Sequence, residues 1–153
     1  MRTAVLRIGE VDAEVARRIQ NGLCKAFPST ECAILEDIMA LPLEAYNASR
    51  KQFHSSFVLS KASGYVKKVA AQIERVLGVT DVDLYVPRLN FVFGEAECPG
   101  KTALISLFRL KPQFYGHLED KELLFERSVK EAVHEVGHTL GLGHCSIPTC
   151  VMF

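Results

Sequence analysis

Three histidines and one glutamate near the C-terminus have the types and the spacing of a zinc site. They lie in residues 134–145, which read H-E-x-x-H-x-x-G-x-x-H-C. His134 and His138 are four residues apart, so on a helix their side chains lie about 40° apart and can face one ion. The H-E-x-x-H pattern on a helix is typical of zinc hydrolases. It predicts a metal site on a helix, with these two histidines as ligands.

His144 can be the third ligand only if the helix ends before it. It follows His138 by six residues, and in a continuous helix it would point about 240° away. Gly141, alone or with Gly143, can end the helix because glycine adopts the left-handed conformation at little cost. Three histidine nitrogens leave one position of a tetrahedral zinc open, which is typical of a catalytic site. We therefore expect a catalytic Zn²⁺ bound by three histidines.

Glu135 follows the first histidine directly and is the expected general base. A carboxylate beside such a site can take a proton from water and pass it to the leaving amine of a peptide bond. The predicted activity is therefore zinc-dependent peptide hydrolysis. Two alternatives stay open at this point. One is a non-catalytic zinc protein that binds peptides or uses the metal structurally, and the other is a zinc hydrolase that acts on a different bond.

The residues after the third histidine resemble those of the archaemetzincins, a family of zinc metallopeptidases in the metzincin clan. The pattern H-E-x-x-H-x-x-G-x-x-H-C-x-x-x-x-C-x-M covers residues 134–152. The resemblance implies that the three histidines bind the catalytic zinc and that Glu135 is the general base. It also implies that Met152 forms the methionine turn beneath the metal.

The same resemblance implies a second zinc site. Cys145 and Cys150 would be half of a four-cysteine structural site, whose other half in that family is a C-x-x-C pair further along the chain. The sequence ends at Phe153 without that pair, and two thiolates cannot complete a tetrahedral site. We therefore expect residues 1–153 to be a single metzincin-like domain that lacks its C-terminal extension. A second zinc is expected only where the extension is present.

The rest of the sequence predicts the scaffold that holds this site. Short apolar runs predict strands, and apolar residues at helical spacing predict helices, the second of which would be capped by Gly78. The expected strands are 4–8, 32–35, 83–86, 89–93 and 103–108, and the expected helices are 11–27, 59–77 and 120–140. Helices between strands favour parallel pairing. We predict an α/β (α+β) fold with a single mixed, mostly parallel five-stranded sheet, one antiparallel edge strand and helices packed on it.

The strand that begins at Leu89 and ends at Phe93 is the expected antiparallel edge, because only a turn signal at Pro99 and Gly100 separates it from the next strand. An extended peptide or protein substrate could pair with such an edge by strand addition. The substrate partner is thus expected to lie along this strand, as the resemblance to metzincins also implies.

Composition limits the other partners and the location of the protein. Lys and Arg number 18 and so do Asp and Glu, which gives no reason to expect nucleic acid or an anionic membrane as a partner. No apolar run has the roughly 20 residues that a membrane span needs. Five cysteines, an odd number, do not favour a disulfide framework. The sequence predicts a cytoplasmic protein with thiols that are free or bind metal.

Overall fold

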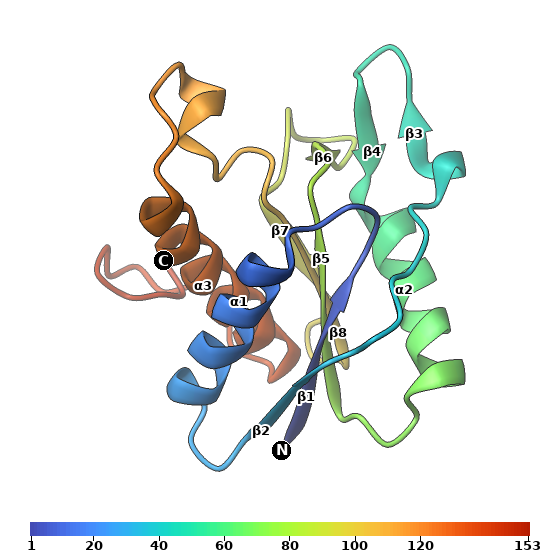
Figure 1. Ribbon diagram of the computed structural model, residues 1–153, viewed down its shortest axis with the longest axis vertical. Coiled ribbons are helices and arrows are strands. Elements are labelled where there is room, and N and C mark those ends of the chain that lie inside the picture. The colour runs from blue at the N-terminus through green and yellow to red at the C-terminus, as the bar shows by residue number, and fades with distance from the viewer.

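A five-stranded sheet forms the centre of the computed structural model, which describes residues 1–153 (Figure 1). The first four strands of the sheet are parallel, and the last is an antiparallel edge strand. This confirms the predicted mostly parallel sheet with one antiparallel edge. In spatial order the strands are β2 (Glu31–Ile34), β1 (Arg2–Arg7), β5 (Arg75–Thr80), β8 (Thr102–Ser106) and β7 (Gly94–Ala96).

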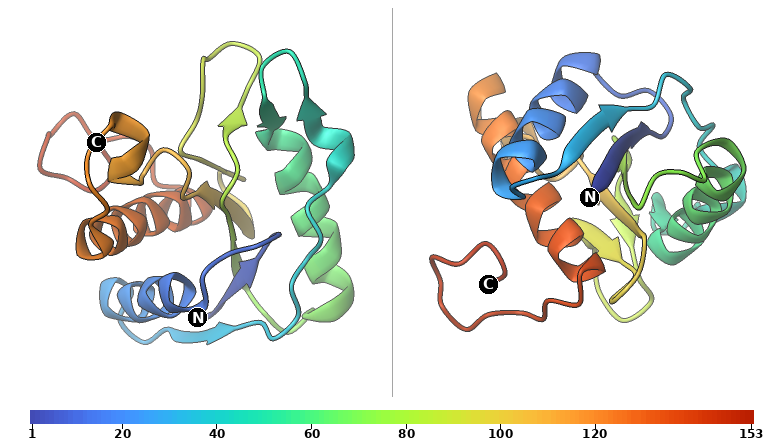
Figure 2. Two further views of the ribbon diagram at one scale, coloured as in Figure 1. Left: turned by 45° about the horizontal axis from the view of Figure 1, so that its top comes forward. Right: turned by 90° about the horizontal axis from the view of Figure 1, so that it is seen from below.

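Helices cover both faces of the sheet. Helices α1 (Ala13–Ala26) and α3 (Lys121–Thr139) pack on one face, and α2 (Ser55–Val69) packs on the other (Figures 1 and 2). None of these helices has an apolar stretch long enough to span a bilayer. Each begins at a side-chain cap that satisfies a free backbone N–H group of the first turn, as Asp120 does for the N–H of Leu123 at 3.0 Å. Helix α3, which carries the histidines, is thereby fixed at its start.

The protein has two apolar cores because both sheet faces are buried. Val5 and Leu77 point into the core under α1 and α3, whereas Leu6 and Val76 point into the core under α2. Strands buried on both faces have no polar side to alternate with, so their sequences read as continuous apolar runs.

A second, three-stranded sheet lies beyond the carboxyl end of β5 and was not indicated by the sequence. It consists of β3 (Tyr46–Asn47), β4 (Gln52–His54) and β6 (Leu84–Tyr85). The strand predicted at residues 83–86 therefore exists in shortened form, but it pairs with β4 and not with the main sheet. Single 3₁₀ turns precede β3, at Leu43–Ala45, and α3, at Pro112–Tyr115.

The prediction of one helix over residues 59–77 was wrong. Helix α2 ends at Val69, and residues Arg75–Thr80 form β5 in the middle of the sheet. Gly78 lies inside this strand and caps no helix. A Cβ at Gly78 would lie 2.8 Å from the side chain of Ile8, which follows β1, so the glycine makes room for this isoleucine. A short apolar run buried on both faces resembles a helix segment in its periodicity, which explains the error.

The predicted edge strand was also misplaced. The segment from Leu89 to Phe93 forms a turn followed by a single bridge from Val92 to Leu84, and the antiparallel edge of the main sheet is β7 (Gly94–Ala96). The apolar side chains of 89–93 have another use. Phe93 packs against the core under α3, and its ring stacks edge-to-face on that of Phe91. The true edge strand holds glycine and glutamate, residues that strand propensity does not favour.

Candidate metal centre and active site

The end of helix α3 has the geometry that the spacing of the histidines requires. The helix ends at Thr139, and Gly141 adopts a left-handed conformation with φ of 87°. The N–H groups of Gly141 and Leu142 donate to the carbonyls of His138 and Gly137, at 2.9 and 3.2 Å. These bonds close the last turn of the helix as in a Schellman motif. The chain then turns back, as predicted, and brings the third histidine towards the helix.

His134, His138 and His144 come together, with one ligand nitrogen from each within 4.8 Å of the others. The three rings approach one another at centroid distances of 4.6 to 5.3 Å. His134 and His138 are half-buried, and His144 is exposed. No other group of three or more His, Cys, Asp or Glu side chains in the structure is arranged to hold a metal ion. The structure thus brings together the three histidines that the sequence singled out.

Hydrogen bonds to backbone carbonyls fix the tautomer of two of these rings. His134 Nδ1 donates to the carbonyl of Val151 at 2.8 Å, and His138 Nδ1 donates to the carbonyl of Leu142 at 2.7 Å. A carbonyl can only accept, so each neutral ring carries its proton on Nδ1 and its lone pair on Nε2. The two Nε2 atoms lie 3.0 Å apart. Two lone pairs at this distance repel unless a cation lies between them, so the site fits a metal ion that prefers imidazole, such as zinc.

Glu135 is buried beside the histidines, with only 5% of its surface exposed. The edge strand approaches it so closely that a Cβ at Gly94 would lie 2.7 Å from the Glu135 side chain and equally close to the carbonyl oxygen of Leu104. Gly94 therefore lets β7 lie directly against the glutamate. The sequence analysis missed Gly94, because the contact joins residues that are far apart in the chain.

The electrostatic surroundings of Glu135 favour its protonated form. Burial, followed by the charges of Glu131 and Glu95, raises the pKa of Glu135 to about 8. Burial also raises the pKa of Glu131, which lies one helical turn before Glu135. A bound dication would oppose these effects by favouring the charged carboxylate. Glu131 was not singled out from the sequence, although its i, i+4 spacing from Glu135 was a usable signal.

Met152 lies beneath helix α3 and is almost fully buried, at 6% exposure. A Cβ at Gly137 would lie 2.8 Å from its sulfur atom, so the glycine makes room for the methionine. The Met152 carbonyl accepts a hydrogen bond from the N–H of Cys145 at 2.7 Å. This bond closes the chain after the third histidine into a loop that ends at Met152.

Cys145 and Cys150 lie in this C-terminal loop and are half-buried free thiols. The Cys150 sulfur accepts a weak hydrogen bond from the N–H of Met152 at 3.4 Å. The other cysteines, Cys24, Cys32 and Cys98, do not join them in a group of metal ligands. The loop therefore holds two thiols, and no other cysteine joins them.

Comparison with known proteins agrees with this geometry. Residues 32–153 match the family model described as Peptidase family M54. An archaemetzincin from Methanocaldococcus jannaschii is 45% identical over 152 residues, which cover 99% of this chain and 79% of the relative. An archaemetzincin from Pyrococcus abyssi is 39% identical over 151 residues, covering 97% of this chain and 79% of the relative.

Two crystal structures share the fold. The archaemetzincin of Archaeoglobus fulgidus, solved in complex with malonate, superposes with a TM-score of 0.81 at 40% identity and covers 99% of this chain and 85% of its own. A zinc-dependent peptidase from Methanocorpusculum labreanum superposes with a TM-score of 0.88 at 30% identity and covers 99% and 87%.

The fold, the three-histidine centre and these comparisons define a zinc metallopeptidase, which is a hydrolase. Within that class, the chain belongs to the archaemetzincins, Peptidase family M54.

Proposed function

We propose that His134, His138 and His144 bind the catalytic zinc and that Glu135 is the general base for peptide-bond hydrolysis. The convergence of the three imidazoles carries the proposal, because the two Nδ1–carbonyl bonds leave the facing Nε2 lone pairs free for a cation. Zinc in such a centre supplies Lewis acidity, which polarises a carbonyl and acidifies water.

Glu135 is suited to move the proton. Its carboxylate lies on the same helix turn as the first histidine and is shielded from solvent by β7. A general base has to be ionised before it accepts a proton, and a bound dication would favour the charged form of this carboxyl against the burial that raises its pKa. Glu135 would accept a proton from the attacking water on a carboxylate oxygen and donate it to the leaving nitrogen.

The edge strand β7 provides a place for the substrate backbone. The carbonyl of Phe93 accepts from the N–H of Ser106 at 2.8 Å, and the N–H of Glu97 donates to the carbonyl of Thr102 at 3.0 Å. In an antiparallel ladder these bonds fall on alternate residues. The amide and carbonyl groups of Gly94 therefore face away from β8, as do those of Ala96. An extended peptide would pair with these groups by strand addition, directly beside Glu135.

The C-terminal loop has a further role in the proposal. Met152 would support the metal centre from below, where its soft side chain fills the space beside Gly137. Cys145 and Cys150 would be two ligands of a second, structural zinc when the chain supplies two more. Elemental analysis tests this, because one zinc per chain is expected for residues 1–153 and two for a chain with a further Cys-x-x-Cys pair.

The central test is the Glu135→Gln variant of the zinc-loaded protein. Amide and carboxylate have nearly the same shape, so zinc content should stay unchanged while hydrolysis of a peptide and amino-acid-amide panel falls by about 10²- to 10⁴-fold. Glu126→Gln is the matched control, because Glu126 lies on the same helix but pairs with Lys130 at the surface. Undiminished hydrolysis by Glu135→Gln would refute the assigned role. An inactive but fully metallated parent protein would instead favour a non-catalytic zinc protein.

A further inference from the structure

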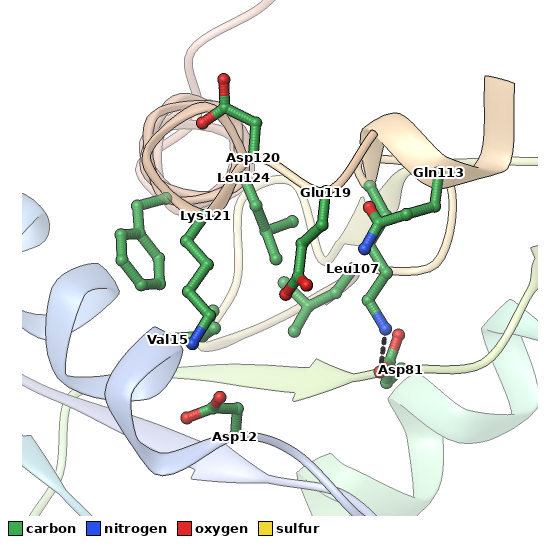
Figure 3. Close-up of a pocket in the computed structure, with 11 residues that line it drawn as sticks. Asp12, Val15, Asp81, Leu107, Gln113, Glu119, Asp120, Lys121 and Leu124 are labelled. Atoms are coloured by element: carbon green, nitrogen blue, oxygen red, sulfur yellow. Dashed lines mark hydrogen bonds and ion pairs between the residues drawn. The ribbon is translucent and has the colours of Figure 1, made fainter. Parts of the chain in front are cut away.

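A cavity of about 180 Å³ lies at the other end of helix α3, away from the histidines. It opens between the first turns of α1 and α3, at the carboxyl ends of β5 and β8 (Figure 3). Helix α1, which follows β1, packs on one face of the sheet, and α2, which precedes β5, packs on the other. The strands β2 and β5 therefore lie on opposite sides of β1, and the strand order reverses beside this cavity. Ligands of open α/β sheets bind outside the carboxyl ends of the strands at such a switch point.

The cavity is separate from the metal centre. Lys121 at its rim and His134 are thirteen residues apart on one continuous helix, which corresponds to about 20 Å at 1.5 Å per residue. None of the residues that line the cavity takes part in the proposed hydrolysis. Its side chains therefore need an explanation of their own.

The floor of the cavity is apolar and its rim is charged. The floor is formed by Val15, Leu107, Leu124 and Phe125. All of these except Leu124 are buried in the core. A floor of this kind favours an aliphatic group over water.

Most charges at the rim already have partners. Asp12 and Asp120 accept hydrogen bonds from the first turns of α1 and α3. Asp81 pairs with Lys111 through one carboxylate oxygen, while its other oxygen, Oδ1, is buried and has no hydrogen-bond partner. These three carboxylates are therefore already engaged by the protein itself.

Two rim charges of opposite sign are without any partner. Glu119 and Lys121 extend from the start of α3 into the cavity (Figure 3). Neither makes a hydrogen bond or an ion pair, with each other or with any other residue, although the protein forms five ion pairs, one of them between Asp81 and Lys111 at this cavity. The cavity therefore offers one free carboxylate and one free ammonium group above an apolar floor.

We propose that this cavity binds a free α-amino acid with an apolar side chain. Its ammonium group would donate to Glu119, and its carboxylate would accept from Lys121. The aliphatic side chain would lie on the floor. The volume of about 180 Å³ corresponds to roughly six water molecules at about 30 Å³ each, which suits a molecule of this size. A free amino acid is also a product of complete peptide hydrolysis, but the binding site does not depend on the proposed catalytic roles.

Titration calorimetry of the zinc-loaded protein tests the proposal with three related ligands. L-leucine should bind with one site per chain. N-acetyl-L-leucine lacks the ammonium group and 3-methylbutylamine lacks the carboxylate, so each should bind at least about tenfold more weakly. Equal binding of 3-methylbutylamine would mean that the site recognises only an apolar amine, which would overturn the proposal.

Two rim variants locate the binding. Glu119→Gln and Lys121→Gln remove one charge each at exposed positions, so the fold should be unaffected, and each should raise the dissociation constant for L-leucine about tenfold. Lys130→Gln, which changes an exposed lysine of the same helix outside the cavity, should leave it unchanged. Leucine binding that persists in the Glu119→Gln, Lys121→Gln double variant would place the ligand elsewhere, including at the metal centre, and refute the proposal. Absence of binding by L-leucine, L-valine and L-methionine at millimolar concentrations would refute it as well.

Discussion

Replacing Gly94 by alanine should damage the active site without removing the metal. The added Cβ would lie 2.7 Å from both Cγ and Oε1 of Glu135 and 2.7 Å from the Leu104 carbonyl oxygen. Ordinary contacts of a Cβ atom begin at 3.4 Å, so one side must move by the difference of 0.7 Å. Moving the strand away from Glu135 does not relieve the contact with Leu104, which belongs to the neighbouring strand β8. The backbone has to adjust to clear the Leu104 carbonyl, and the Glu135 side chain is expected to shift to clear the other two contacts.

The size of this shift sets the expected loss. A misplacement of about 1 Å at a reacting group can cost on the order of 100-fold in rate, so a shift of 0.7 Å should lower kcat by roughly 10- to 100-fold. Overpacking of a well-packed site costs about 1–3 kcal/mol of unfolding free energy. None of the three atoms nearest to the new Cβ belongs to a histidine, so the zinc content should remain at the level of the parent protein.

The assay combines steady-state hydrolysis, zinc analysis and urea unfolding. Gly64→Ala is the matched control, because a Cβ at Gly64 would meet no atom within 4 Å in the middle of helix α2. It should leave kcat unchanged and add about 0.5–1 kcal/mol of stability, since alanine favours the helix over glycine. A Gly94→Ala protein with parental kcat and parental stability would refute the reasoning that β7 presses on Glu135.

Three further perturbations have expected outcomes. Gly137→Ala places a Cβ 2.8 Å from the sulfur of Met152, so it should lower the free energy of unfolding by about 1–3 kcal/mol and weaken zinc binding, measured by competition with a chelator. The control is Gly143→Ala, whose added Cβ meets no atom within 4 Å and should have neither effect. Removing zinc with a chelator should abolish hydrolysis and lower Tm. Zinc should restore both, with about 4 kcal/mol of stabilisation at a free concentration 1,000 times Kd, whereas Mg²⁺ should not because it prefers oxygen ligands. Burial acts to raise the pKa of Glu97, but hydrogen bonds from the N–H groups of Lys101 and Thr102 outweigh it and lower that pKa. Its stabilising effect should therefore be present near neutral pH and be lost as the pH falls through the lowered pKa, so Glu97→Gln should cost about 1 kcal/mol at pH 7 and nothing in acid; a constant difference at all pH values would contradict this.

The metal centre was predictable because its determinants are local. His134 and His138 share a helix face, and the left-handed turn at Gly141 returns the chain within a few residues. Each of these statements follows from helix geometry and from the conformational freedom of glycine. The Nδ1 bond to the Val151 carbonyl was not predictable in the same way, because it depends on the path of the C-terminal loop.

The type of sheet, mostly parallel with one antiparallel edge, was predictable, but two of its strands, β5 and β7, were not. Its three inner strands, β1, β5 and β8, all have side chains in both cores, so hydrophobic periodicity could not distinguish β5 from the end of a helix. The edge strand β7 is only three residues long, Gly94–Ala96, and contains no residue that favours a strand strongly. Its place is decided by pairing with β8, which no window of the sequence contains.

The same difference between local and distant determinants explains why Glu135, the glutamate proposed as the general base, looked simpler in the sequence than in the fold. Glu135 was identified by its position after the first histidine, which says nothing about its protonation. In the structure its pKa is raised first by burial and then by Glu131 and Glu95, and burial in turn requires the absence of a side chain at Gly94. One residue that shapes the surroundings of Glu135 is therefore a glycine on another element. Glycine has no functional group to attract attention, so only the contact between β7 and α3 reveals its role.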